Sequence, residues 1–164
     1  MKKNLSSNDF LREFALAQSL IDTHLSIRAN LKELGVIRTN RDVISDYGEW
    51  IAANLLNLKL VPNDVQKGYD STDRKGKKYE IKARRQKKRG SPAYHFRQVT
   101  PKEFDFAVFV EFNQYLFPSM IAVVPYLVFK RHVTKTKRSF RFYFTKEMRK
   151  NPNIRFVKIP LVKN

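Results

Sequence analysis

Apolar residues recur at helical spacing in the first sixty positions and predict two helices. From Asp9 to Leu34 they fall every three or four residues, and Gly35 ends the pattern. A second helix is expected from about Arg41 to Leu58, with Thr39 as its N-cap and Asp42 three residues further on. Its apolar residues form a stripe that should face the core. They are Val43, Tyr47, Ile51, Leu55 and Leu58.

The later part of the chain has the patterns of strands. Residues 65–71 and 77–84 predict a hairpin around a turn at residues 73–76. Residues 104–112, rich in Phe and Val, predict a strand buried on both faces. A strand at 120–124, a short helix from Pro125 to about His132, and extended segments at 139–144 and 153–162 should follow. With no repeat or linker, residues 1–164 are expected to form one domain, an N-terminal helical segment at 1–38 and a core at 39–164.

Charge gives the first indication of a partner. The chain has 33 Lys and Arg against 15 Asp and Glu, a net charge of +18 that favours a polyanion. A small basic binder without catalytic activity fits this charge slightly better than an enzyme does, and an anionic membrane surface is a third, weaker option. The apolar run at 107–129 is broken by Glu111, Asn113, Gln114 and two prolines, so it predicts strands and no membrane span.

Several classes of site are excluded by composition. The chain lacks cysteine, which rules out disulfides and thiolate metal sites and is consistent with a cytoplasmic location. Its three histidines are far apart in sequence, without the paired spacing of zinc hydrolases. It has no glycine-rich phosphate loop, so no nucleotide cofactor is expected.

The clearest chemical pattern lies between Gly68 and Lys82. Glu80 and Lys82 are two positions apart, so in a strand they project from one face while Ile81 points towards the core. The predicted hairpin brings Asp70 back beside Glu80, so that two carboxylates and an ammonium meet. Oxygen ligands of this kind suit Mg²⁺ or Mn²⁺, and the lysine could then orient a water molecule and stabilise charge on a phosphate.

The alternative explanation for these residues is structural. A Glu-x-Lys pair on a strand is a common surface feature, and an isolated Asp before a turn is usually a turn residue. Glu49 adds to the chemical interpretation, because the positions three and four residues away hold Ser45, Asp46, Ala52 and Ala53, none of them a cation. A hydrogen bond from a backbone amide to the Glu49 carboxylate would be an equally good explanation.

Asp70 followed by Glu80-Ile81-Lys82 resembles the PD-(D/E)xK signature of the restriction-endonuclease-like nucleases, and the helix with Glu49 resembles an acidic helix position found in many members. The similarity spans residues 39–110, about half of the chain, and departs from the signature at Tyr69, which stands where it has proline. It implies an α/β (α+β) fold with a mixed central sheet flanked by helices.

The resemblance also implies a mechanism. Asp70, Glu80 and the backbone carbonyl of Ile81 would bind Mg²⁺ or Mn²⁺, and Glu49 would hold a second metal or an outer-shell water. In-line attack by water would leave 5′-phosphate and 3′-hydroxyl ends. Gln98 could contact a phosphate or a metal-bound water. Double-stranded DNA is the expected partner, and a homodimer would be needed to cut both strands.

A basic segment follows the expected site strand and is predicted to be a solvated loop that binds nucleic acid. The positions expected to contact phosphates or bases are Arg84, Arg85, Lys87, Lys88, Arg89, His95, Arg97 and Gln98. The leading hypothesis is therefore a metal-dependent endodeoxyribonuclease of the type II restriction kind. Two alternatives are a non-catalytic nucleic-acid-binding module or subunit of a larger complex, and a structure-selective repair or recombination nuclease.

Overall fold

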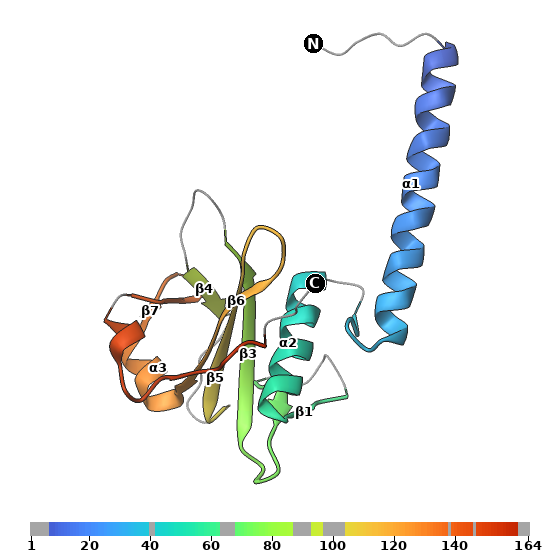
Figure 1. Cartoon of the computed structure of the whole chain (residues 1–164). Coiled ribbons are helices and arrows are strands. Elements are labelled where there is room, and N and C mark those ends of the chain that lie inside the picture. Colours follow the sequence, from blue (N-terminus) through green and yellow to red (C-terminus); the bar gives the residue numbers. More distant parts are fainter. Residues whose placement is uncertain are drawn as a thin grey trace. The chain divides into compact units, whose positions relative to one another are not determined.

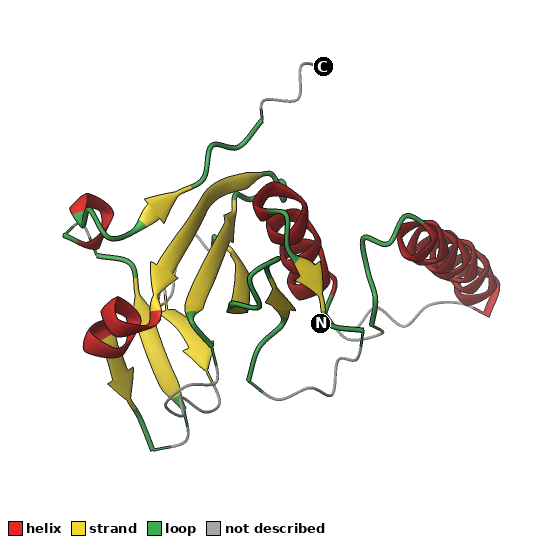
Figure 2. Ribbon diagram, turned by 90° about the horizontal axis from the view of Figure 1, so that it is seen from below, coloured by secondary structure: helices red, strands yellow, loops and turns green. Residues whose placement is uncertain are grey.

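The computed structural model describes residues 7–39, 42–62, 68–86, 93–96, 104–137, 139–145 and 147–160. The chain divides into two compact units, residues 1–38 and 39–164. Helices and strands are both present, so the predicted mixture of elements is confirmed (Figures 1 and 2).

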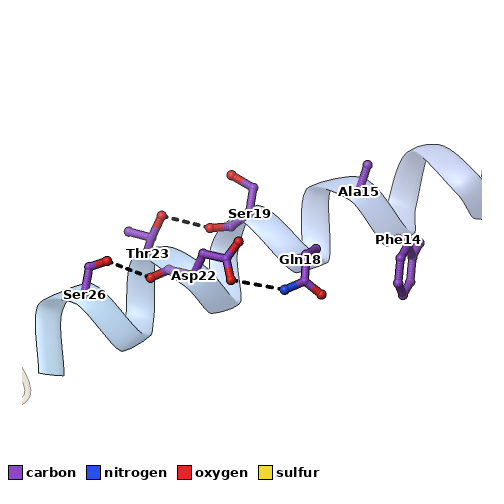
Figure 3. Close-up of a pocket in the computed structure, with 7 residues that line it drawn as sticks. All are labelled: Phe14, Ala15, Gln18, Ser19, Asp22, Thr23 and Ser26. Atoms are coloured by element: carbon purple, nitrogen blue, oxygen red, sulfur yellow. Dashed lines mark hydrogen bonds between the residues drawn. The ribbon is translucent and has the colours of Figure 1, made fainter. Parts of the chain in front are cut away.

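The first unit consists mainly of helix α1 (Ser7–Glu33), which confirms the predicted helix and runs without a break. Large apolar side chains along it, such as Phe14 and Leu20, are more than half exposed. A shallow depression on α1 is lined by polar side chains that bond within the helix, such as Thr23 to the carbonyl of Ser19 at 2.9 Å (Figure 3). Because all these groups belong to one helix, the depression brings no separate elements together. Among the described residues, no helix is both long and apolar enough to span a membrane.

A mixed sheet of six strands forms the centre of the second unit. Its strands follow the order β1-β2-β3-β5-β6-β9, with β3 and β5 parallel and every other neighbouring pair antiparallel. The strands are β1 (Lys59–Leu60), β2 (Ser71–Thr72), β3 (Lys78–Arg85), β5 (Phe106–Phe112), β6 (Pro118–Pro125) and β9 (Arg155–Phe156). Strand β5 is almost completely buried and therefore confirms the strand predicted with two covered faces.

Helix α2 (Val43–Leu56) packs on one face of this sheet, where it covers Tyr79 and Ile81 of β3 (Figure 1). The prediction that Thr39 caps this helix is wrong. Asp42 is the N-cap and accepts a hydrogen bond from the amide of Ile44, while the amide and hydroxyl groups of Thr39 both donate to Asp46. An aspartate carboxylate next to the first helical residue satisfies an amide that has no partner within the helix.

The opposite face of the sheet is covered by a second, three-stranded antiparallel sheet and by helix α3 (Tyr126–His132), which begins after Pro125 as predicted. The second sheet has the order β4-β8-β7, with β4 (Ala93–Phe96), β8 (Phe140–Tyr143) and β7 (Val133–Lys135). Aromatic side chains fill the space between the two sheets, with the rings of Phe109 and Phe142 stacked at 4.4 Å. A 3₁₀ helix, Met148–Lys150, precedes β9.

The predicted hairpin is present around its turn but differs in length. Gly76 takes a left-handed conformation with φ of 74°, and Asp73 accepts hydrogen bonds from the amides of Lys75 and Lys77, so the turn is confirmed. Its first strand, β2, is only two residues long, and residues 63–67 lie outside the described residues. Because β2 is short, it pairs with β3 only at Lys78 and Tyr79.

Candidate functional site

Asp70 lies at the point where β2 stops pairing with β3. Its amide donates to the carbonyl of Tyr79 at 2.8 Å, and its Oδ2 accepts a hydrogen bond from the amide of Ile81 at 2.6 Å. The carboxylate thus takes the place of a strand partner for one amide of β3. This contact holds Asp70 beside the segment that carries Glu80 and Lys82, as the hairpin prediction required.

Glu80 and Lys82 project from the face of β3 opposite to Tyr79 and Ile81, which are buried under α2. The Lys82 ammonium forms an ion pair with Oε1 of Glu80 and lies 3.3 Å from the carbonyl oxygen of Ile81. The two side chains are 29% and 15% exposed, so the pair is partly open to solvent. The predicted division of β3 into a polar and an apolar face is confirmed.

Three carboxylates influence the Lys82 ammonium. Burial by itself lowers the pKa of Lys82, but the negative charges of Asp70, Glu80 and Glu49 outweigh it and raise the pKa above its usual value. The ring of Phe96, on β4, lies 5.6 Å from the ammonium and adds a cation–π contact. The structure thus brings Asp70, Glu80 and Lys82 together from β3 and the segment before β2, and Glu49 of α2 adds its charge to their electrostatics.

Helix α2, which carries Glu49, approaches β3 very closely. A Cβ atom built on Gly48 would lie 2.3 Å from the Cβ of Ala83, a distance that no real side chain could occupy without moving the helix. Glycine at this position thus allows the close packing of α2 against β3. Glu49 itself is half-buried, next to this contact in the chain.

The donor set is compatible with a hard divalent cation, but it is not a complete cage. Among the described residues, no three His, Asp or Glu side chains gather as a ready-made metal site. Mg²⁺ commonly binds through one or two carboxylates and completes its coordination with water and substrate phosphate. Asp70 and Glu80, which act together on Lys82, would suffice for such a site.

A second ion pair on β3 was not predicted from the sequence. Arg84 pairs with Glu111, which also accepts a hydrogen bond from Gln86 at 2.7 Å, and the guanidinium lies 4.6 Å from the ring of Tyr94. Glu111 is only 4% exposed. Strand β3 continues through Arg85, one residue beyond the predicted end of the strand at Arg84, so the expectation that Arg85 lies in a solvated loop is wrong. The pairing of Arg84 with Glu111 depends on the register between β3 and β5, which the sequence alone does not give.

The remaining predicted nucleic-acid contacts divide into two groups. Arg85 is exposed and donates a hydrogen bond to the carbonyl of Gln114 at 2.5 Å, and His95 is exposed on β4. The other predicted positions lie outside the described residues. They are Lys87, Lys88, Arg89, Arg97 and Gln98.

Comparison with known proteins adds no relative. No protein-family model matches the sequence, and no curated protein matches it significantly.

Proposed function

We propose that the protein is a metal-dependent endonuclease that hydrolyses the phosphodiester bonds of DNA. The observation that supports this best is the position of Asp70, whose carboxylate accepts a hydrogen bond from the amide of Ile81, between the two residues of the Glu80–Lys82 ion pair. The chain as a whole is strongly basic, with a net charge of +18. Carboxylates repel a phosphate unless a cation lies between them, so neighbouring carboxylates in a basic protein favour metal-assisted chemistry over simple binding.

Each residue has a proposed role. Asp70, Glu80 and the carbonyl of Ile81 would hold Mg²⁺ or Mn²⁺, which when bound would neutralise charge on the phosphate. Lys82 would orient the attacking water and stabilise negative charge on the phosphoryl oxygens. Water would form the new bond to phosphorus, and the bond to the 3′ oxygen would break, with its proton supplied from solvent. Glu49 would position a second cation or a water molecule.

The finer parts of the proposal rest on the sequence resemblance. A mixed sheet with β3 and β5 parallel, and α2 packed beside the candidate site, is compatible with the PD-(D/E)xK superfamily. We propose a type II restriction-type enzyme that acts on double-stranded DNA as a homodimer and leaves 5′-phosphate and 3′-hydroxyl ends. Each of these statements can be tested separately from metal-dependent cleavage itself.

The decisive experiment incubates the purified chain with supercoiled plasmid and mixed genomic DNA, with and without Mg²⁺, and maps the ends of the products. We expect cleavage in Mg²⁺ and none in EDTA, with discrete fragments if the enzyme is sequence-specific. Asp70→Asn should remove cleavage. Asp73→Asn is the matched control, because this nearby aspartate contacts the turn amides of Lys75 and Lys77 and should not affect chemistry.

A thermal unfolding series tests metal binding apart from catalysis. Mg²⁺ at ten times its dissociation constant should stabilise the wild type by about 1.4 kcal/mol, and the stabilisation should disappear in Glu80→Gln. Salt-sensitive DNA binding with no metal effect and no nicking would instead indicate a non-catalytic binding module. Cleavage confined to branched DNA would indicate a repair or recombination nuclease.

A further inference from the structure

The turn between β5 and β6 exposes two aromatic side chains. Tyr115 is 72% exposed and Phe117 is 57% exposed, although each could bury more than a hundred square ångströms of apolar surface in a contact. Aromatic side chains at an exposed turn can be removed from water only when a binding partner covers them. The turn therefore has the composition of a contact surface.

The backbone that carries these rings is fixed by hydrogen bonds within the turn. Oδ1 of Asn113 accepts hydrogen bonds from the amides of Tyr115 at 2.8 Å and Phe117 at 3.1 Å. Between them, Leu116 takes a left-handed conformation with φ of 63° and packs against the core beneath α2. A non-glycine residue in this conformation is uncommon, and here it directs the leucine inward between the two exposed aromatics. A turn whose backbone is ordered in advance loses less conformational entropy when it binds.

A cation adjoins the same turn. The guanidinium of Arg85, at the end of β3, donates to the carbonyl of Gln114 at 2.5 Å. A guanidinium has five N–H donors, so this contact leaves it able to reach a phosphate as well. The chain continues after Gln86 with Lys87, Lys88 and Arg89 in the sequence. Aromatic rings beside positive charge are the combination that binds the bases and backbone of nucleic acid.

The turn lies further along the sheet than the candidate site. Arg85 pairs with Phe112 in the parallel register of β3 and β5, so the turn at 113–117 is at the end of the sheet to which β3 leads from Glu80 (Figure 1). Five residues of strand separate Glu80 from Arg85, which corresponds to roughly 16 Å.

We infer that the β5–β6 turn is a nucleic-acid contact in which Tyr115 and Phe117 stack on bases and Arg85 binds the adjoining phosphate. The inference rests on the DNA-binding part of the proposed function and does not depend on cleavage. Base faces are available in single strands, at bulges and at opened steps of a duplex, and the same ring contact serves all three.

Fluorescence anisotropy in EDTA tests this without cleavage, on a single-stranded oligonucleotide, a paired duplex and a duplex with one bulged base. Tyr115→Ala should weaken binding about 5- to 100-fold on at least one of these, and Tyr115→Phe should retain it. A 2-aminopurine in the bound strand should lose its stacking-dependent quenching with Tyr115→Ala. The matched control is Leu127→Ala, an equally exposed apolar side chain on α3, which starts where β6 ends. It should bind as the wild type does.

Arg85→Ala should reduce the slope of log affinity against log salt by about one, whereas Tyr115→Ala should leave the slope unchanged. Wild-type affinity for Tyr115→Ala and Phe117→Ala on all three DNAs, in protein that still binds and cuts, would overturn the turn contact and leave the proposed function intact. A change of oligomeric state in these variants, with DNA affinity unchanged, would show that the turn contacts protein instead. A wild type that binds none of the DNAs would overturn both proposals.

Discussion

The Glu80–Lys82 and Arg84–Glu111 ion pairs lie two residues apart on the same face of β3, yet their charges are balanced differently. Glu111 is 4% exposed and receives donors from both Arg84 and Gln86, so its charge is satisfied within the fold. Around Lys82, three carboxylates act on the ammonium, and the side chains are more exposed. The first arrangement is a buried, structural pair, whereas the second is more open to solvent and brings several carboxylates to act on one ammonium.

Lys82→Ala gives the largest expected effect. If Lys82 stabilises charge on the reacting phosphate, its loss should lower the cleavage rate by about 10²–10³-fold or more, with DNA affinity nearly unchanged. Initial rates of plasmid nicking and anisotropy binding measure the two quantities. Lys78→Ala is the control, because Lys78 lies on the same face of β3, 4.8 Å from the ring of Tyr69, and should cut normally. Equal cleavage by Lys82→Ala and the wild type would remove Lys82 from the mechanism.

Glu111→Ala should affect stability instead of chemistry. Removing one member of a buried pair leaves the other charge unpaired, and we expect a loss of about 3 kcal/mol in the free energy of unfolding, measured by urea denaturation. Replacing both residues, as Arg84→Met with Glu111→Leu, should recover much of this loss, because no unpaired charge remains. Cleavage per folded molecule should stay close to that of the wild type. A Glu111→Ala protein that remains stable but no longer cleaves DNA would contradict this assignment. The Arg84–Glu111 pair would then be part of the catalytic site and not a structural pair.

The two pairs also show what a sequence can and cannot predict. Glu80 and Lys82 were found because strand alternation alone places them on one face, and Asp70 because a short hairpin is a local structure. Glu111 was not found, because its partner lies 27 residues earlier and meets it only through the β3–β5 register. The small strand β4 was missed because its burial comes from packing against the central sheet, which local propensity does not reveal. Likewise, the sequence predicted Thr39 as the N-cap, but Thr39 bonds to Asp46 instead, and the N-cap is Asp42.

A third ion pair, Lys77–Asp105, at the start of the same strand, should give the smallest effect. Its side chains are 54% and 36% exposed. The hydrogen bond from Lys77 and that from the amide of Lys78 lower the pKa of Asp105 below its usual value. A carboxyl with a lowered pKa in the folded state stabilises the protein above its unfolded pKa, and this contribution is lost as the pH falls through the folded value.

Asp105→Asn should therefore lower the melting temperature slightly at neutral pH, by less than Glu111→Ala does, because exposed pairs contribute little. The difference from the wild type should stay constant above about pH 5 and shrink as the pH falls below about 4, where the unfolded state begins to bind a proton at Asp105 and the folded state does not yet do so. High salt should reduce it as well. Melting curves from pH 2.5 to 7 measure this, and a difference that grows towards acid would contradict a stabilising role for the ionised carboxylate. Such a result would mean that Asp105 stabilises the fold through hydrogen bonds that do not require its negative charge. Charged side chains would then stabilise β3 only at Lys82 and Arg84, which are more buried.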